Sequence, residues 1–307
     1  MIDFRYHLVS LISVFLALAV GVVLGAGPLQ NSLGTALNDQ VSSLRADRND
    51  LQSRLEQTEA AVNDRDDYIT SAADTLLPGV LDGRSVAVVL MPEAEGDDID
   101  QVVTEIETAG ATITGRVNLT SAWAETARDS FRSTYSGQFG PYLDDVAADG
   151  NAVLGQGLAT ALTQEGEDAT ALMELLTASD TPLVTVDAQP SGPADMIVVI
   201  GPRTVAAADG SEPTAQATPE QDAAAWTSAL TGAASTATTV VVGAGDAAAD
   251  IVTALRNAEA PVTTVDSIGQ ATAAVSTPLA LAATATGTVG SYGFDDGADA
   301  VIPPISH

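Results

Sequence analysis

The side chains that most often carry out catalysis are scarce in this sequence. It contains no Cys and two His, His7 and His307. Without Cys there is no thiolate nucleophile, no disulfide and no Cys-based zinc or iron–sulfur site. His7 precedes an apolar run and His307 is the last residue, so we expect neither in a pocket, and a Ser-His-Asp triad has no base. We therefore predict a non-enzymatic protein without catalytic residues, metal ligands or a cofactor.

Two short motifs have the residue types of ligand-binding loops. Gly243–Gly245 follows an expected strand and opens an expected helix, which is where a phosphate loop would lie. It lacks the third Gly of the dinucleotide fingerprint, and the chain has no Lys for a P-loop. We interpret it as a tight turn with Asp246 as the helix N-cap. Residues 295–299 (DDGAD) lack the distal Glu of an EF-hand and indicate a solvated turn.

The composition is strongly acidic. The 41 Asp and Glu outnumber 11 basic residues, which are all Arg, and the formal net charge is −30. Such a chain repels phosphate groups, so nucleic acid and anionic lipid surfaces are poor partners. Hydrophobic residues make up 46% of the 307 residues, which is enough for one or two globular domains.

An apolar run near the amino terminus, residues 8–27, predicts a transmembrane helix. At about 1.5 Å per residue it spans about 30 Å, the thickness of the hydrocarbon core of a bilayer. Arg5 and His7 precede the run, and the next basic residue is Arg45. The positive-inside rule therefore places residues 1–7 in the cytoplasm and the chain after residue 28 outside. A cleaved signal peptide is the alternative, although its apolar region usually has about 7–15 residues.

Residues 28–77 have the pattern of a coiled-coil stalk. From Leu37 the apolar positions are spaced alternately by four and three residues, the period of about 3.5 residues of a coiled coil. So narrow a stripe needs a partner, most simply a second copy in a parallel dimer. The alternative is that the helix packs against the globular domain of the same chain. The predicted seam consists of Leu37, Val41, Leu44, Arg48, Leu51, Leu55 and Val62.

Residues 78–307 are expected to form an extracytoplasmic, Rossmann-like α/β domain. Short Val and Ile runs alternate with Ala-rich helical segments, which predicts βαβ units and a mostly parallel sheet buried on both faces. Residues 201–219 are rich in Ala, Thr, Pro, Asp and Gly, which indicates a surface excursion between two possible halves. The expected strands are 85–91, 111–119, 183–186, 196–200, 239–242 and 261–265, with helices near 98–109 and 247–257.

The opening sequence MIDFRYHLVSLISVFLALAVGVVLGAGPL resembles the start of the mycobacterial copper-transport protein B (MctB) family, which includes the corynebacterial cell-separation protein SteB. Val265-Asp266, Gly269–Gly290 and Ser291-Tyr292-Gly293 resemble the carboxy-terminal part of that family. The resemblance implies an actinobacterial envelope protein. It also implies one of two functions: a copper-exporting outer-membrane channel, or an inner-membrane partner of a cytoplasmic SteA-like protein in the control of peptidoglycan cleavage at cell separation.

The residues weigh against the copper channel. Copper sites favour Cys, Met and His. None of the four Met lies in a Met motif, and Met91 and Met196 lie in or beside strand runs, which indicates core packing. A strand-built outer-membrane channel needs alternating strands of about ten residues. The sequence predicts one spanning helix and buried parallel strands instead.

We therefore favour a scaffold that acts across the inner membrane. As the resemblance implies, Asp3, Arg5, Tyr6 and His7 would bind the SteA-like partner. The alternative is that these residues only set topology and anchor the helix at the interface. The outer domain would bind a peptidoglycan hydrolase or its regulator. A ligand-binding or hydrolase domain is a third possibility, because 41 acidic residues always offer carboxylate pairs.

Overall fold

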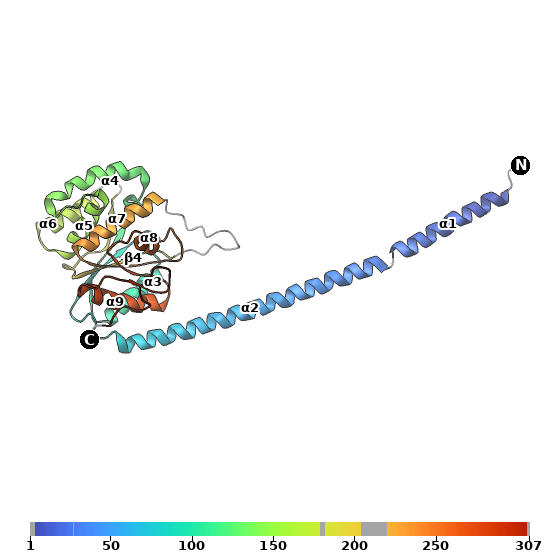
Figure 1. Ribbon diagram of the computed structural model, residues 1–307, viewed down its shortest axis with the longest axis horizontal. Helices are drawn as coiled ribbons and strands as arrows, with labels where there is room; N and C mark the ends of the chain where they lie inside the picture. The colour runs from blue at the N-terminus through green and yellow to red at the C-terminus, as the bar shows by residue number, and fades with distance from the viewer. Residues whose placement is uncertain (1–3, 27, 179–181, 204–219, 306–307) are drawn as a thin grey trace. The chain divides into compact units, whose positions relative to one another are not determined.

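A computed structural model describes residues 4–26, 28–178, 182–203 and 220–305, with the side chains of 24–36 and 220–222 left aside. The chain forms two compact units, residues 1–65 and residues 66–307. Figure 1 shows their elements in chain order. Asp3, His307 and most of the expected excursion, residues 204–219, lie outside the described residues.

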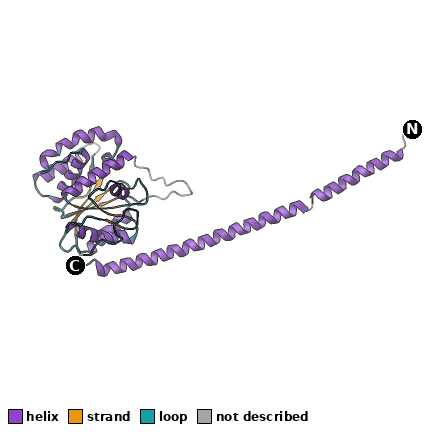
Figure 2. Cartoon of the chain, in the orientation of Figure 1, coloured by secondary structure: helices purple, strands orange, loops and turns teal. Residues whose placement is uncertain are grey.

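The first unit is helical (Figure 2). Helix α1 (Phe4–Ala26) contains residues 8–26 of the apolar run and begins within the expected tail. Helix α2 (Pro28–Leu76) begins with a Pro, which is tolerated in a first turn because its missing N–H has no partner there. α2 ends just before Pro78, because a Pro disfavours helical backbone at the residue before it.

The second unit contains a seven-stranded sheet in the order β3-β2-β1-β4-β5-β6-β7. All neighbouring strands are parallel except β2 and β3, which are antiparallel. The prediction of a mostly parallel α/β domain is therefore confirmed. The strands are β1 (Ser85–Leu90), β2 (Thr112–Leu119), β3 (Val184–Ala188), β4 (Met196–Ile200), β5 (Thr238–Val242), β6 (Thr263–Val265) and β7 (Ser291–Tyr292).

Helices cover both faces of this sheet (Figure 1). The connection after each parallel strand crosses back over the sheet, so a helix packs on one face or the other. The helices are α3 (Gly96–Thr108), α4 (Asp129–Tyr135), α5 (Gly150–Thr163), α6 (Glu167–Thr177), α7 (Glu220–Thr236), α8 (Ile251–Asn257) and α9 (Ala271–Ala285). Four 3₁₀ turns, η1 (Ser121–Trp123), η2 (Thr126–Arg128), η3 (Ser136–Gln138) and η4 (Gly140–Tyr142), lie between β2 and α5.

The sheet separates two hydrophobic cores because successive side chains of a strand point to opposite faces. In β1, Val86 and Val88 point into one core and Ala87 and Val89 into the other. One core contains η1 and helices α5 to α8, with Trp123 stacked on Trp226 at a ring distance of 6.1 Å. The other contains α3 and α9.

The end of α2 belongs to the second of these cores. Ala73, Leu77 and Leu81 are buried members of the core that contains α3 and α9, and Ile69 packs against this core. Pro78–Gly79 makes the turn that follows, where Gly79 has a φ of 87°, a conformation that favours Gly. From about residue 69 onward, the end of α2 therefore packs against the globular domain of the same chain.

Candidate functional site

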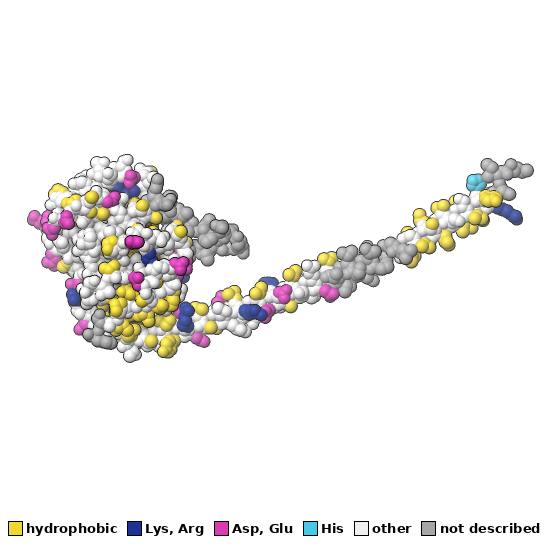
Figure 3. Space-filling model, in the orientation of Figure 1, with side chains coloured by type: hydrophobic (Ala, Val, Ile, Leu, Met, Phe, Trp, Pro, Cys, Tyr) yellow, Lys and Arg dark blue, Asp and Glu magenta, His cyan; other side chains and the backbone are white. Residues whose placement is uncertain are grey.

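The predicted seam lies on an uncovered face of α2. Its apolar side chains are between 39% and 66% exposed, and Arg48 is exposed with them. Within residues 37–65 they alternate along the helix with acidic and basic side chains, as Figure 3 shows. An exposed apolar stripe of this length is typical of a surface that binds another helix or protein. The apolar members are Leu37, Val41, Leu44, Leu51, Leu55 and Val62.

Helix α1 has the properties of a membrane span. Residues Phe4–Val23 form a 20-residue stretch with a mean hydropathy of 2.3, none of it buried. Figure 3 shows hydrophobic side chains over the visible part of this helix. The Ser13 hydroxyl donates to the Val9 carbonyl at 2.9 Å, so this polar group is satisfied within the helix. The length and composition fit a membrane anchor.

The predicted partner-binding residues of the tail are only partly described. Arg5, Tyr6 and His7 lie in the first turns of α1 and are exposed, Tyr6 to 78%. Asp3 lies outside the described residues. Because Arg5, Tyr6 and His7 are consecutive in one helix, they point in different directions around its axis. A partner would therefore have to surround this helix end to contact all three.

In the second unit, the strand order reverses between β1 and β4, the position at which doubly wound α/β proteins bind ligands. An ion pair lies there among the described residues. Arg203, just after β4, forms two hydrogen bonds with Asp98 in the first turn of α3. Asp98 is buried, and the hydrogen bond to it raises the pKa of Arg203. Gly269 lies against this guanidinium, where a Cβ would overlap it.

The most buried ion pair of the described residues lies at the carboxyl edge of β6. Arg256 of α8 donates to Asp266 at 2.9 Å, and the two side chains are 5% and 0% exposed. Asp266 also accepts bonds from the Ser267 hydroxyl at 2.7 Å and from the backbone N–H groups of Phe294 and Asp295 at 2.8 and 3.0 Å. These bonds satisfy a buried carboxylate that would otherwise be costly.

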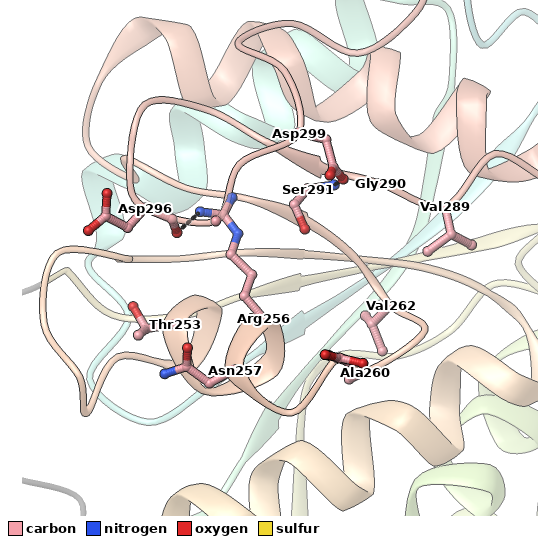
Figure 4. Close-up of a pocket in the computed structure, with 12 residues that line it drawn as sticks. Thr253, Arg256, Asn257, Ala260, Val262, Val289, Gly290, Ser291, Asp296 and Asp299 are labelled. Atoms are coloured by element: carbon pink, nitrogen blue, oxygen red, sulfur yellow. Dashed lines mark hydrogen bonds between the residues drawn. The ribbon is translucent and has the colours of Figure 1, made fainter.

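Arg256 also holds the segment that follows β7. Its guanidinium donates to the backbone carbonyls of Tyr292 at 3.0 Å and Asp296 at 3.2 Å, and its Nε donates to the Thr264 hydroxyl at 3.2 Å. Figure 4 shows the side chain reaching from α8 to this segment. Asp266 and Arg256 together therefore fasten the carboxy-terminal loop to β6 and α8. Sequence reasoning missed this pair, although Asp266 follows an expected strand directly.

Asp295 completes this cluster and differs from its prediction. It was expected in a solvated turn, yet its Oδ2 atom is buried and receives no hydrogen bond from the described residues. Burial, and then the neighbouring carboxylates Asp266 and Asp246, raise the pKa of Asp295 to about 6. When Asp295 is protonated, its carboxyl group can donate a hydrogen bond to Asp246. The protonated form also removes one of the three neighbouring negative charges and so reduces their repulsion.

The expected N-cap role of Asp246 is wrong. Helix α8 begins at Ile251, and Asp250 precedes it. The Asp250 carboxylate accepts the Ala247 N–H at 2.8 Å and so closes a turn ahead of the helix. Asp246 is left beside Asp295, where it contributes to the acidic cluster instead of a cap.

A cleft of about 400 Å³ lies beside this ion pair, between the end of α8 and β7 (Figure 4). Arg256 forms part of its wall, but its guanidinium already donates to Asp266 and three backbone carbonyls. The cleft is also lined by the exposed carboxylates Glu259, Asp296 and Asp299. Its field therefore suits a small cation better than a phosphate or other anion.

The described residues offer little to a copper ion. They contain no group of three or more His, Cys, Asp or Glu side chains arranged to hold a metal. Met91 and Met196 are 6% and 2% exposed and lie in the two cores, as predicted. Met173 packs against one of these cores, and Met1 lies outside the described residues.

Comparison with known proteins identifies relatives along the chain. The model of the family described as "Copper transport outer membrane protein, MctB" matches residues 1–303. Proteins named copper transporter MctB from Mycobacterium bovis and Mycobacterium tuberculosis are 32% identical over 197 residues, covering 61% of this chain and 57% of theirs. That of Mycobacterium leprae is 34% identical over 125 residues, covering 41% of this chain and 39% of its own. The match thus spans a little more than half the length of the Mycobacterium bovis and Mycobacterium tuberculosis relatives and less than half of the Mycobacterium leprae relative. Because the family model covers nearly all of it, the chain belongs to the MctB family.

Proposed function

We propose that this protein is a non-enzymatic, single-pass scaffold of the inner (cell) membrane that forms a parallel dimer through α2. In this proposal the amino terminus lies in the cytoplasm and the α/β domain outside the cell. The observation that carries it is the exposed apolar seam of α2, which follows a membrane-length helix and has no cover within the described chain. A charge asymmetry along α1 supports the orientation, because Arg5 and His7 lie in its first turns and the next basic residue is Arg45.

The energetics favour pairing of membrane-anchored chains. Half-burying a Val or Leu side chain contributes about 1 kcal/mol. The six apolar seam residues of each chain, twelve in a pair, then contribute about 12 kcal/mol. Association costs about 4–15 kcal/mol in lost freedom of motion. Free stalks would therefore pair weakly, and anchoring both in one membrane removes part of the cost by raising their effective concentration.

The proposed role is to connect a cytoplasmic protein with the control of peptidoglycan cleavage during cell separation. The tail residues Asp3, Arg5, Tyr6 and His7 would bind a SteA-like partner, and the α/β domain would bind a peptidoglycan hydrolase or its regulator. A dimer presents two tails and two outer domains together, which increases the avidity for dimeric or clustered partners. The cell-separation role is supported by the resemblance to the corynebacterial member of the family.

The test is recovery of the SteA-like protein with the full-length chain from membranes. We would replace residues 1–7 with a sequence of equal length that keeps a basic residue, so that the orientation is unchanged. The variant should lose the partner and remain a dimer. The matched control, Ser53→Asp on the solvent face of α2, should keep both. Unchanged recovery after replacement of the tail would exclude the tail as the binding element.

Copper homeostasis is the second candidate, because the family description and the relatives' names give copper transport. It would require a copper site, and the described residues contain no cluster of His, Cys and carboxylate side chains that could form one. Titrating the full-length protein in detergent with Cu(I) and with Cu(II) separates the candidates. Stoichiometric tight binding that Met173→Leu weakens would favour copper. Heat of dilution only, for both ions, would favour the scaffold.

A further inference from the structure

The seam of α2 has the composition of a two-stranded parallel coiled coil. Such coils prefer β-branched residues at heptad position a and Leu at position d. The first complete pair, Val41 and Leu44, follows this rule. With that pair as reference, position a holds Val41, Arg48, Leu55 and Val62, and position d holds Leu37, Leu44, Leu51, Thr58 and Arg65.

Two arginines stand in this seam, and each can meet a carboxylate. In a coiled coil every seam side chain enters a hole formed by four residues of the facing helix. In an unstaggered parallel pair, the hole for an a residue includes the residue just before its equivalent, and the hole for a d residue includes the one just after. The hole facing Arg48 then contains Asp47 of the second copy. The hole facing Arg65 contains Asp66 of the second copy.

Staggered pairs lose the counter-ion of Arg48. A shift of one heptad in one direction places Arg54 of the second copy in its hole, so that like charges meet. A shift in the other direction places Gln40 there. Only the unstaggered pair gives Arg48 a carboxylate. A polar residue at a single a position is a known way to specify register at some cost in stability.

The flanking positions agree with the same arrangement. In a parallel coil, a g residue lies near the e residue five positions later on the other helix. Arg54 at g would therefore pair with Glu59 at e. Within one chain Arg54 pairs with Asp50 at 2.9 Å, but both side chains are well exposed, at 72% and 60%. An exposed pair of this kind contributes only about 0.3–0.5 kcal/mol, so it does not prevent the interhelical contact.

We infer that Arg48 determines the register of an unstaggered, parallel stalk dimer, with Asp47 of the second copy as its counter-ion. Arg65 and Asp66 repeat the arrangement further along α2. This inference rests on the proposed dimer and specifies how its two chains align. It follows that the two tails and the two outer domains of a pair stand level with each other.

Disulfide formation tests the alignment directly, because the native chain has no Cys. Leu44→Cys, Leu51→Cys and Ser53→Cys would each be made in the full-length protein and oxidised in membranes with diamide. In an unstaggered parallel pair the d positions of the two copies face each other, so Leu44→Cys and Leu51→Cys should crosslink. Ser53→Cys, at the outward f position, should not. Crosslinking of Ser53→Cys to the same extent as Leu44→Cys would overturn the alignment.

The role of Arg48 is tested by competition between registers. Leu44→Cys and Leu51→Cys chains carrying different tags would be co-expressed. The matched disulfides should exceed the mixed disulfide at least about tenfold, which corresponds to about 1.4 kcal/mol. In an Arg48→Leu background this preference should fall severalfold, because a purely apolar layer accepts a shifted partner. An unchanged ratio would show that Arg48 does not set the register.

The counter-ion is tested by charge exchange. Asp47→Arg should reduce the Leu44→Cys disulfide severalfold, and the double variant Asp47→Arg/Arg48→Asp should restore it. Asp39→Arg makes the same change of charge at an outward position and should have no effect. Sedimentation in detergent separates the two possible failures. A dimer that does not crosslink at Leu44→Cys overturns the register but not the scaffold, whereas a monomer overturns both.

Discussion

Removal of the buried Asp266 carboxylate should destabilise the α/β domain far more than removal of an exposed carboxylate. Asp266→Ala leaves the Arg256 guanidinium, whose side chain is 5% exposed, without its buried counter-ion. Breaking one partner of a buried pair typically costs about 3–5 kcal/mol. The N–H groups of Phe294 and Asp295 also lose their acceptor. Water can reach part of this loop, so we expect a total near 4 kcal/mol.

For a domain of this size about 1 kcal/mol corresponds to about 2–4 °C in Tm, so the midpoint should fall by roughly 8–16 °C. Thermal unfolding of the full-length protein in detergent, followed by circular dichroism, measures it. Asp187→Ala is the matched control, because the Arg116–Asp187 pair is long, at 3.7 Å, and Asp187 is 51% exposed. It should cost under about 1 kcal/mol. Equal shifts in Tm for Asp266→Ala and Asp187→Ala would refute the buried-pair reasoning. The double variant Asp266→Leu/Arg256→Met replaces both partners and should therefore be more stable than Asp266→Ala, and the opposite order would also refute it.

Three further outcomes are expected. The pKa of Asp295 in the folded protein is raised to about 6, so the folded state favours the protonated carboxyl group. This contribution to the stability of the wild type is fully present below about pH 4 and is lost as the pH rises through 6. Asp295→Asn should match the wild type at pH 4 and exceed it by about 1 kcal/mol at pH 8 after allowance for solvent screening, and a difference independent of pH in urea unfolding would contradict this. Gly293→Ala should cost about 2–3 kcal/mol in the same assay, since Gly293 has a φ of 130° and a Cβ there would overlap the Asp266 carboxylate. Gly192→Ala, which has open space around it, should be nearly neutral. Leu51→Asp should convert the dimer to monomers in detergent sedimentation, whereas Ser53→Asp should leave it dimeric. If both variants were monomeric, or both dimeric, the seam would not be the dimer contact.

The elements that the sequence predicts well are those whose environment leaves a clear pattern. β4 was expected at 196–200 and spans Met196–Ile200, because a five-residue apolar run bounded by Asp195 and Gly201 is typical of a buried strand. Helices α5 and α9 were not predicted. Most of their residues are buried, so no clear polar face alternates with an apolar one and the helical period is weak.

The direction of β3 and the buried cluster depend on tertiary contacts that a local pattern does not contain. The run Leu183–Val186 indicates a strand, but nothing in it tells that β3 runs antiparallel to β2. Likewise Asp266 and Asp295 are two Asp among 41 acidic residues, and only the fold brings them beside Asp246 and Arg256. A carboxylate directly after an expected strand was the one local signal, since such positions meet at one edge of a parallel sheet.

The stacked pair Trp123 and Trp226 has a practical consequence for spectroscopy. These are the two Trp of the chain, and both lie in the core formed by η1 and helices α5 to α8. Intrinsic indole emission therefore reports on one side of the sheet alone. The opposite layer, with α3, α9 and the end of α2, could loosen while the emission spectrum stays constant. Any partner that binds on that side would be optically silent unless a new fluorophore were placed there.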